Sequence, residues 1–281
     1  MTGIVSGVDY SVLFSGTTNT NIGASLMNIL TSTPTASPGT AISSGNPLTD
    51  LKLAQQNEKA EVAKEAKQPQ VARDIAAFQK GVTSAKTLDQ ALSNPNVLKV
   101  LLTANNLASN ISAPGLAKKV LLSDPSDPNA LVNKMPGTAW KNAVKTFDLA
   151  KTGLKGLTDP KVVATLTNAY AEVKWRQSLD TATPGLSNAL AFLQQAKSLT
   201  SVDQILGDQV SRAVVTTALG LPQEIAYQTL EAQETAVTSR LDIRNLQDPK
   251  FVTKLTDRYL MEMQQQHQSS STGSNLFALT A

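Results

Sequence analysis

The sequence has no cysteine, a single histidine, and few aromatic residues, which form 4% of its 281 residues. Without cysteine, the chain cannot make a disulfide bond, a thiolate metal site or a thiol nucleophile. The lone histidine, His267, excludes a metal site built on paired histidines and the usual histidine-based catalytic triads and dyads. These absences remove the most common types of enzyme active site.

Other signatures of catalysis are also missing. We find no phosphate-binding loop, dinucleotide fingerprint, nucleophile elbow or EF-hand spacing. Pairs of carboxylates such as Asp242 and Asp248 occur, but 22 acidic residues produce such pairs by chance, and a glycosidase-type acid and base pair stays an alternative. We therefore predict that the protein is not an enzyme, with no catalytic, cofactor-binding or metal-binding residues, no cofactor and no evident small-molecule substrate.

Charge and hydrophobicity give little reason to expect nucleic acid or a membrane as partner. The 25 basic and 22 acidic residues are mixed along the chain and leave a net charge of +3, too weak to attract nucleic acid. No run approaches the ~20 apolar residues that span a bilayer, so we predict no membrane insertion. Residues 1–30 contain no lysine or arginine, so they do not form a standard cleavable signal peptide.

The two ends of the chain are polar. Serine and threonine make up 15 of the 40 residues from Ser11 to Asp50, too polar a composition to offset the entropy of ordering. We predict a flexible arm over 1–49, a polar connecting helix over 50–69 and a flexible tail over 266–281. Within the first arm, apolar residues recur at helical spacing between 22 and 30 and would line one face of a short helix if a partner covered that face, but we favour a transient helix in a mobile arm.

An internal duplication is the strongest signal between these ends. Residues 87–107 align without a gap on 201–221, a shift of 114 residues with seven identities in 21. Residues 157–170 align on 246–259 with a different shift, 89 residues, and eight identities in 14. We predict two helical modules, over 70–156 and 157–265, and because the shifts differ we do not expect a regular solenoid.

The repeated residues have the spacing of helix starts. Thr87 with Gln90, and Ser201 with Gln204, each predict a capping box, in which the hydroxyl accepts from an amide of the first turn and the glutamine reaches back to the cap. Aspartate before proline predicts further N-caps. These aspartates are Asp124, Asp127, Asp159 and Asp248.

Helix ends and apolar stripes complete the pattern. Asn106 and Gly220 occupy equivalent positions where a left-handed residue ends a helix. Apolar residues at helical spacing, including Leu166, Tyr170 and Tyr259, predict core faces. No strand pattern occurs, so we predict an all-α fold, a compact helical domain built from an internal duplication with flexible N- and C-terminal arms. The helices are expected at 50–68, 70–83, 87–93, 95–106, 112–121, 136–152, 159–178, 185–199, 201–207, 208–219, 222–240 and 248–265.

The two tryptophans, Trp140 and Trp175, have two interpretations. Exposed tryptophans often anchor a partner interface. Burial at a helix contact is the more common fate, and we favour it here.

Several motifs of the chain resemble a family of domains of unknown function, numbered 1217, which occurs in alphaproteobacteria and is often encoded among flagellar genes. The likeness covers roughly residues 70–262, and its most specific part is the Thr-Ala-Leu-Gly-Leu-Pro box at 217–222. The first module departs from the family at Asn105-Asn106-Leu107 and around residues 130–140. The other motifs that carry the resemblance are Val71-Ala72-Arg73-Asp74, Thr87-Leu88-Asp89, Leu190-Ala191-Phe192, Thr200-Ser201, Ile205-Leu206, Arg240-Leu241-Asp242-Ile243 and Asp248-Pro249.

This resemblance implies an all-helical fold and a flagellar association, and it supplies no catalytic residues. Few aromatics, no cysteine and a polar arm are also typical of exported flagellar proteins. We predict a non-enzymatic structural or assembly component of the bacterial flagellum that acts in motility through protein–protein packing with flagellar proteins or with itself. Export would use the type III flagellar route without a cleaved signal peptide. The alternative is a cytoplasmic flagellar export chaperone or assembly regulator.

Overall fold

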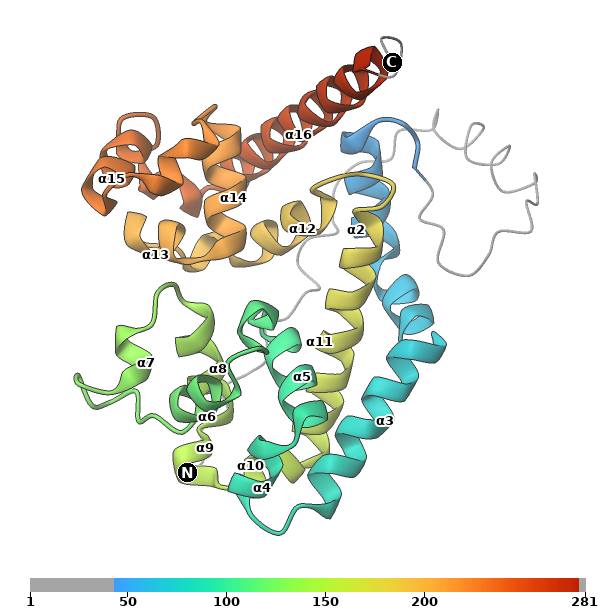
Figure 1. Ribbon diagram of the computed structural model, residues 1–281, viewed down its shortest axis with the longest axis vertical. Helices are drawn as coiled ribbons and strands as arrows, with labels where there is room; N and C mark the ends of the chain where they lie inside the picture. The colour runs from blue at the N-terminus through green and yellow to red at the C-terminus, as the bar shows by residue number, and fades with distance from the viewer. Residues whose placement is uncertain (1–42, 278–281) are drawn as a thin grey trace. The chain divides into compact units, whose positions relative to one another are not determined.

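A computed structural model describes the chain from Ser43 to Phe277, and its side chains as far as Ser269. Every regular element in this range is a helix and none is a strand, which confirms the predicted all-α class (Figure 1). The predicted arm over 1–49 lies almost entirely outside the described residues, as does the apolar spacing between 22 and 30.

The helices follow one another with short connections. In the first part of the chain they are α2 (Pro47–Glu65), α3 (Pro69–Ser84), α4 (Leu88–Ser93), α5 (Pro95–Ala104), the 3-10 helix η2 (Ala108–Asn110), α6 (Pro114–Leu121), α7 (Leu131–Lys134), α8 (Ala139–Phe147), α9 (Leu149–Thr152), α10 (Lys155–Thr158) and α11 (Pro160–Leu179). In the second part they are α12 (Leu186–Gln195), η3 (Ala196–Ser198), α13 (Val202–Gly207), α14 (Gln209–Ala218), η4 (Gln223–Tyr227), α15 (Leu230–Thr238), η5 (Ile243–Gln247) and α16 (Pro249–Phe277).

Two groups of helices have the same order and the same packing partners. In the first set α3 and α11 both pack on α5, which α4 precedes, and in the second set α12 and α16 both pack on α14, which α13 precedes. Both α4 and α5 have the bounds of α13 and α14 once 114 residues are added. The start of α11 meets the start of α16 at a shift of 89. The elements therefore recur as the two alignments predict, while a shared origin of the two sets stays a prediction.

The caps are built alike in the two sets. The hydroxyls of Thr87 and Ser201 accept from the backbone N–H of Gln90 and Gln204, respectively. Each glutamine side chain accepts in turn from the backbone N–H of the residue before the cap, one position earlier than a standard capping box predicts. The four short polar contacts explain why both helices start where they do.

The aspartates before proline divide into two kinds. Asp159 and Asp248 accept from the N–H two residues on and cap α11 and α16 as predicted. Asp124 and Asp127 make the same contact with Ser126 and Asn129, but they close turns instead of starting helices. An aspartate side chain that accepts from the amide two residues ahead can stabilise a turn as well as a helix start. The prediction that Asp124 and Asp127 are helix N-caps was therefore wrong.

The two sets differ in what joins their central helix to their last one. The first insert, residues 108–152, holds η2 and α6 to α9, whereas the second insert, residues 223–238, holds only η4 and α15. The segments between the two aligned stretches, residues 108–156 and 222–245, differ by 49 − 24 = 25 residues, which is the difference between the two alignment shifts, 114 − 89 = 25. The structure also moves the boundary between the two predicted modules. The predicted division between residues 156 and 157 falls inside α10. Helix α11, which the prediction assigned to the second module, packs with the first set.

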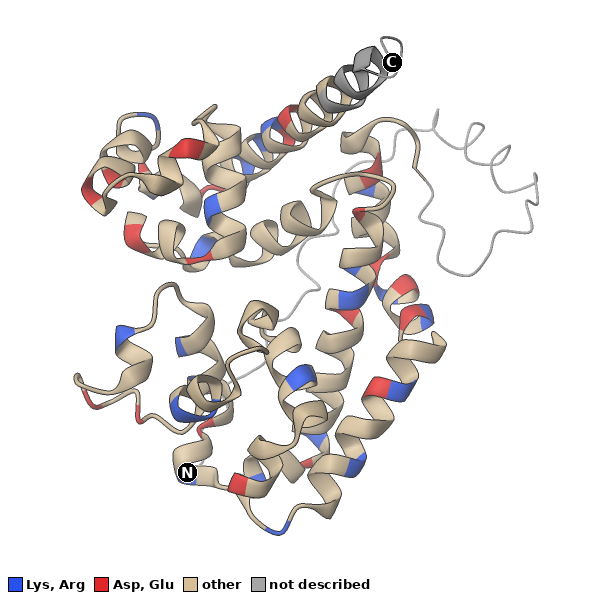
Figure 2. Ribbon diagram, viewed as in Figure 1, with Lys and Arg blue, Asp and Glu red and all other residues tan. Residues whose placement is uncertain are grey.

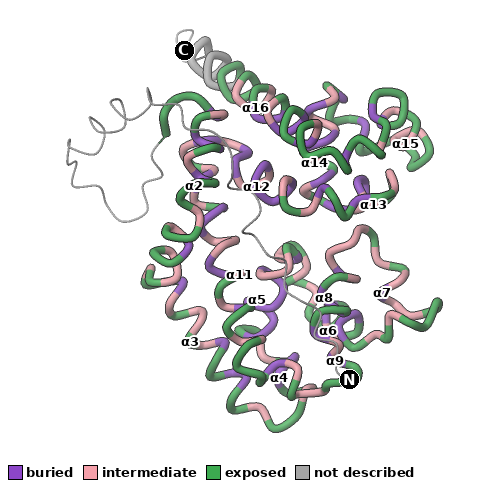
Figure 3. The backbone as a smooth tube through the Cα atoms, turned by 180° about the vertical axis from the view of Figure 1, so that it is seen from behind, coloured by how far each residue is buried: buried purple, intermediate pink, exposed green. Residues whose placement is uncertain are grey.

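Helices α2 and α11 connect the two sets. Helix α11 packs on α3 and α5 and also on α12, and α2 packs on α11, α12 and α16. The buried residues lie along the facing sides of these helices, as the view from behind shows (Figure 3). Phe78 in α3 and Phe192 in α12 occupy equivalent places and are fully buried. Burying a phenylalanine side chain stabilises a fold by roughly 1.5–3 kcal/mol.

Three predicted helices have different bounds in the structure. The helix expected at 136–152 breaks at Asp148, whose φ of 43° is left-handed, and the one expected at 222–240 divides because Thr229 starts a new helix by accepting from the N–H of Ala232. The last helix continues beyond 265, since α16 reaches Phe277. The polar run from Gln264 therefore extends a helix in what was predicted as a flexible tail over 266–281.

Candidate interaction surface

The most exposed large apolar side chain among the described residues belongs to the second insert. Tyr227, at the end of η4, is 91% exposed, and Leu230, at the start of α15, is 55% exposed. Most residues from Pro222 to Glu231 are exposed too, with Ile225 the only buried one. Tyrosine is enriched among the anchors of protein interfaces, so this exposed tyrosine marks a candidate docking site.

Local backbone chemistry holds this loop in place. Helix α14 ends at Gly220, whose φ of 64° suits glycine, and the N–H of Leu221 donates to the carbonyl of Thr216. Leu221 and Ile225 are buried on either side of Pro222 and fix both ends of the turn. Tyr227 therefore lies on a loop whose backbone is held in one conformation. This lowers the entropy cost of binding a partner through the tyrosine side chain.

Acidic side chains surround the two apolar ones. Helix α15 packs against α13, and this contact brings Glu234 next to Asp203. A hydrogen bond between these two carboxyl groups raises the pKa of Glu234, with smaller contributions from desolvation and from the charges of Asp203 and Glu231. Figure 2 shows the acidic residues on α13, α15 and the loop before α15. We call Asp203, Glu224, Tyr227, Leu230, Glu231 and Glu234 the tyrosine surface.

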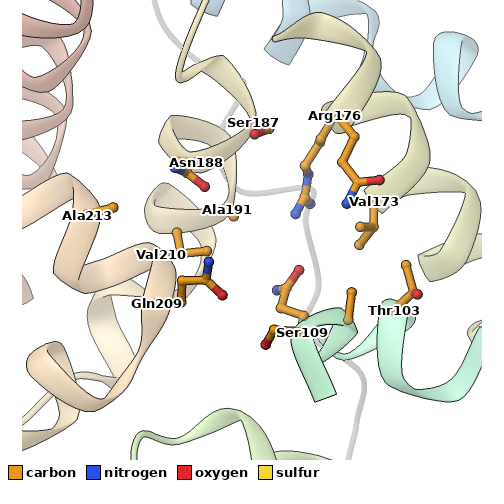
Figure 4. Close-up of a pocket in the computed structure, with 13 residues that line it drawn as sticks. Thr103, Ser109, Val173, Arg176, Ser187, Asn188, Ala191, Gln209, Val210 and Ala213 are labelled. Atoms are coloured by element: carbon orange, nitrogen blue, oxygen red, sulfur yellow. The ribbon is translucent and has the colours of Figure 1, made fainter. Parts of the chain in front are cut away.

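A second feature is a cleft between the two helical sets, with a volume of about 310 Å³ (Figure 4). The first set contributes polar side chains from α5, η2 and α11, and the second set contributes them from α12 and α14. The polar lining residues are Thr103, Asn106, Ser109, Arg176, Gln177, Ser187, Asn188 and Gln209. This volume is near the lower limit for a small-molecule site.

The guanidinium group of Arg176 points into the cleft (Figure 4) although the residue is only 4% exposed. It forms an ion pair with Glu172, one helical turn away, and lies 3.6 Å from a carboxylate oxygen of Glu58 on α2. Two carboxylates beside one guanidinium leave this wall without a net positive charge. The arrangement therefore joins α2 to α11 and gives the cleft little attraction for an anion.

The first insert touches the second set through a close contact of two glycines. A Cβ atom placed on Gly207, at the end of α13, would lie 2.5 Å from the backbone nitrogen of Gly137 in the loop before α8. No side chain fits in that space, so glycine is required at Gly207 for the first insert to touch the second set. In the first set the equivalent residue is Ser93, whose hydroxyl accepts from Lys118 of α6.

The buried polar residues elsewhere have structural roles. Tyr170 of α11 donates to Asp74 of α3 at 2.6 Å, and Lys99 of α5 forms an ion pair with the same carboxylate at 2.7 Å. Burial works to raise the pKa of Asp74, but the hydrogen bonds from Lys99, Tyr170 and Gln70 outweigh it and hold the pKa below its usual value. Desolvation and the bond to Asp74 raise the pKa of Tyr170, which keeps its proton.

The structure also places the residues considered from sequence. Trp140 and Trp175 are 3% and 4% exposed, so the burial that we favoured is confirmed. His267 is an exposed residue of α16. Within residues 43–277, no group of three acidic, cysteine or histidine side chains is placed to hold a metal ion, and no helix is long and apolar enough to cross a membrane.

Sequence reasoning missed Tyr227. The stretch from 222 to 240 reads as one amphipathic helix, which would bury Ile225 and leave no reason to single out the tyrosine. The available signal was Thr229, a good N-cap residue inside the supposed helix. A break at this point makes Tyr227 the end of a short turn, with its side chain outside the apolar stripe.

Comparison with known proteins identifies the family. A family model described as "Protein of unknown function (DUF1217)" matches residues 104–252, which is more than half of the chain. The chain belongs to this family. The match includes both inserts and the box at 217–222, and it confirms the resemblance noted in the sequence.

One solved structure supports the fold of the DUF1217 chain. It is the crystal structure of protein AGR_C_984 from Agrobacterium tumefaciens, with 24% sequence identity and a TM-score of 0.67. The likeness covers 83% of this chain and 99% of the other. At this identity the likeness concerns the fold alone. No curated protein matches the chain.

Proposed function

We propose that this protein is a non-enzymatic structural or assembly component of the bacterial flagellum that acts through protein–protein packing. The observation that supports the packing role is the tyrosine surface, where Tyr227 is 91% exposed on a loop held by buried residues at both ends. Solvent exposure of a large aromatic side chain is unfavourable unless a partner covers it, and tyrosine is enriched among the residues that dominate binding energy.

The flagellar part of the proposal has a different basis. Family membership supports it, because the family resembled by the sequence is often encoded among flagellar genes. The composition supports it too, since the chain has no cysteine, 4% aromatic residues and a serine- and threonine-rich stretch at its N-terminus. Family membership and composition are arguments about where the protein works, whereas the tyrosine surface is an argument that it works by binding other proteins.

The packing role is tested by removing the exposed side chains in cells. The double variant Tyr227→Ala and Leu230→Ser should fold normally, because substitutions at exposed positions change stability by only about 0.5 kcal/mol. We expect its amount in purified flagella to fall at least severalfold relative to the wild type. The measurement is quantitative immunoblotting of flagellar and whole-cell fractions.

A matched control removes an exposed apolar side chain from another element. Met261 of α16 is 45% exposed, so the variant Met261→Ala removes an exposed apolar side chain away from the loop, with a smaller change in exposed area than the double variant. It should incorporate like the wild type. Equal loss in both variants, or no loss in the first, would show that the tyrosine surface is not the packing site.

The site of action is tested by fractionation. A structural component is expected in purified filaments or hooks, or in the culture supernatant of mutants with unfinished flagella. A protein confined to the cytoplasm and bound to a flagellar subunit before export would instead support the alternative, an export chaperone or assembly regulator.

A further inference from the structure

The two inserts of the chain carry opposite charge. The first insert, residues 108–152, contains six basic and three acidic residues, a net charge of 6 − 3 = +3. The second insert, residues 223–238, contains three acidic residues and no basic residue, a net charge of −3. Figure 2 shows lysines on α6, α7 and α8 of the first insert, and acidic residues around α13 and α15. The small net charge of the whole chain hides this separation.

The first insert also has an exposed apolar stripe. Leu116 and Leu122 are 39% and 36% exposed, and Lys119, which is exposed too, lies between them at the i, i+3, i+6 spacing of one helix face. The opposite face of α6 is buried in the core. Helix α7 packs on α6 and contributes the exposed Lys134. We call Leu116, Lys119, Leu122 and Lys134 the lysine surface.

The lysine and tyrosine surfaces are complementary in two respects. Each has two large apolar side chains exposed to water, and their charges are opposite in sign. Apolar side chains surrounded by charge pair best with apolar side chains surrounded by the opposite charge, because the contact excludes water and the charges set the orientation. Among the described residues, no ion pair joins the first insert to residues 199–239 of the same chain.

We propose that the tyrosine surface of one copy binds the lysine surface of a second copy. This inference rests on the proposed function in one respect, namely that the tyrosine surface is a protein-docking site, and it names the partner. The contact is heterologous, since two different patches meet. The bound pair therefore still offers one free surface of each kind to further copies, one on each of its two members, unless these two free surfaces bind each other.

Association of this type depends on concentration and on salt. Raising the ionic strength from 0.1 to 1 M shortens the screening length from about 10 to about 3 Å. We therefore expect the dissociation constant of the wild-type protein to rise at least tenfold over this range. Sedimentation velocity on a concentration series in each salt gives both constants.

A charge exchange tests the pairing itself. The triple variant Glu224→Lys, Glu231→Lys and Glu234→Lys gives the tyrosine surface a net charge of 3 − 1 = +2, so both surfaces of that variant are basic. The variant Lys119→Glu with Lys134→Glu makes both surfaces acidic. Each variant alone should sediment as a monomer at concentrations where the wild type associates. An equimolar mixture should associate again, because every basic surface then meets an acidic one.

A control separates the surfaces from net charge. Lys59 of α2 and Lys80 of α3 are exposed and belong to neither surface, so Lys59→Glu with Lys80→Glu makes the same change in net charge as the lysine-surface variant. We expect it to associate like the wild type. Circular dichroism and thermal unfolding of every variant show whether it is folded, so that lost association is read only from folded protein.

The outcomes separate this inference from the proposed function. A wild-type protein that stays monomeric at all concentrations, or a mixture of the two variants that does not associate, would overturn the pairing between copies. The proposed function would stand in that case if the variant at Tyr227 and Leu230 still fails to enter flagella, since a different flagellar protein would then occupy the tyrosine surface. Restored association in the mixture supports the inference directly.

Discussion

The two helical sets share their internal packing and differ in what surrounds it. Both place a phenylalanine-bearing helix and a long tyrosine-bearing helix on a central one, and both start the helix pairs with the same hydroxyl and glutamine caps. Their inserts, residues 108–152 and 223–238, differ in length by 45 − 16 = 29 residues and have opposite charge. The comparison teaches that the repeated residues maintain the core, whereas the candidate docking surfaces, Asp203 apart, lie in the parts that do not repeat.

The largest effect is expected where the two sets touch. Replacing Gly207 with alanine would place a carbon atom 2.5 Å from the backbone nitrogen of Gly137, so the end of α13 or the loop before α8 would have to shift. We expect Gly207→Ala to lower the free energy of unfolding by about 2–3 kcal/mol, the range typical of overpacking. The equivalent variant in the first set, Ser93→Ala, removes only a partly exposed hydrogen bond and should cost less than about 1 kcal/mol. Urea unfolding of both variants measures the difference, and equal costs would mean that the glycine contact does not form.

The two long helices are compared through their tyrosines. The hydroxyl of Tyr170 donates to the carboxylate of Asp74 at 2.6 Å, whereas that of Tyr259 only accepts from the amide of Asn188 at 3.3 Å. Because hydrogen bonds to charged groups are the stronger ones, we expect Tyr170→Phe to cost about 2 kcal/mol and Tyr259→Phe about 0.5 kcal/mol. Thermal unfolding monitored at 222 nm ranks the two. A larger loss at Tyr259 would contradict this account.

The same carboxylate makes the first set sensitive to acid. Because the pKa of Asp74 is lower in the folded protein than in the unfolded chain, its contribution to stability is present above the unfolded pKa of about 4 and is lost as the pH falls through the folded pKa. We expect the stability difference between wild type and Asp74→Asn to stay constant above about pH 5 and to shrink below about pH 4. Urea titrations at several pH values check this. A difference that grows on acidification would have the wrong sign.

The smallest effect is expected at the equivalent helix ends. Asn106 and Gly220 have φ values of 58° and 64°, both left-handed. Asparagine tolerates this conformation better than other residues with a side chain, so Asn106→Gly and Gly220→Asn should each change stability by less than about 1 kcal/mol. Gly220→Val should cost clearly more, because a β-branched residue is strained there. Similar stabilities for the valine and asparagine variants would show that this conformation is not required.

Much of the fold was predictable because its signals are local. Caps such as Thr87 and Asp248 act within one turn, and apolar stripes ending in Tyr170 and Tyr259 repeat at helical spacing, so helix bounds and core faces follow from neighbouring residues. The breaks at Asp148 and Thr229 were missed because residues good at forming helices surround them. The extension of α16 to Phe277 was missed because its polar run has no apolar face.

The candidate surface was less predictable because exposure depends on tertiary packing. Apart from the N-cap residue Thr229, nothing near Tyr227 distinguishes it from Tyr170, whose side chain is fully buried. The glycine contact is also invisible locally, since Gly207 and Gly137 are distant in sequence and ordinary in their surroundings. The separation of charge between the inserts, by contrast, can be counted from the sequence once the insert bounds are known.

Helix α11 has a consequence for cooperativity. With 20 residues and a rise of about 1.5 Å each, it is about 30 Å long and belongs to the core of the first set while its far end packs on α12. Opening one set alone would require this helix to fray in the middle, where each lost turn exposes buried side chains of both sets. We therefore expect the slowest-exchanging amides of both sets to exchange through the same global unfolding event, so that the protein behaves as a single cooperative unit despite its repeated elements.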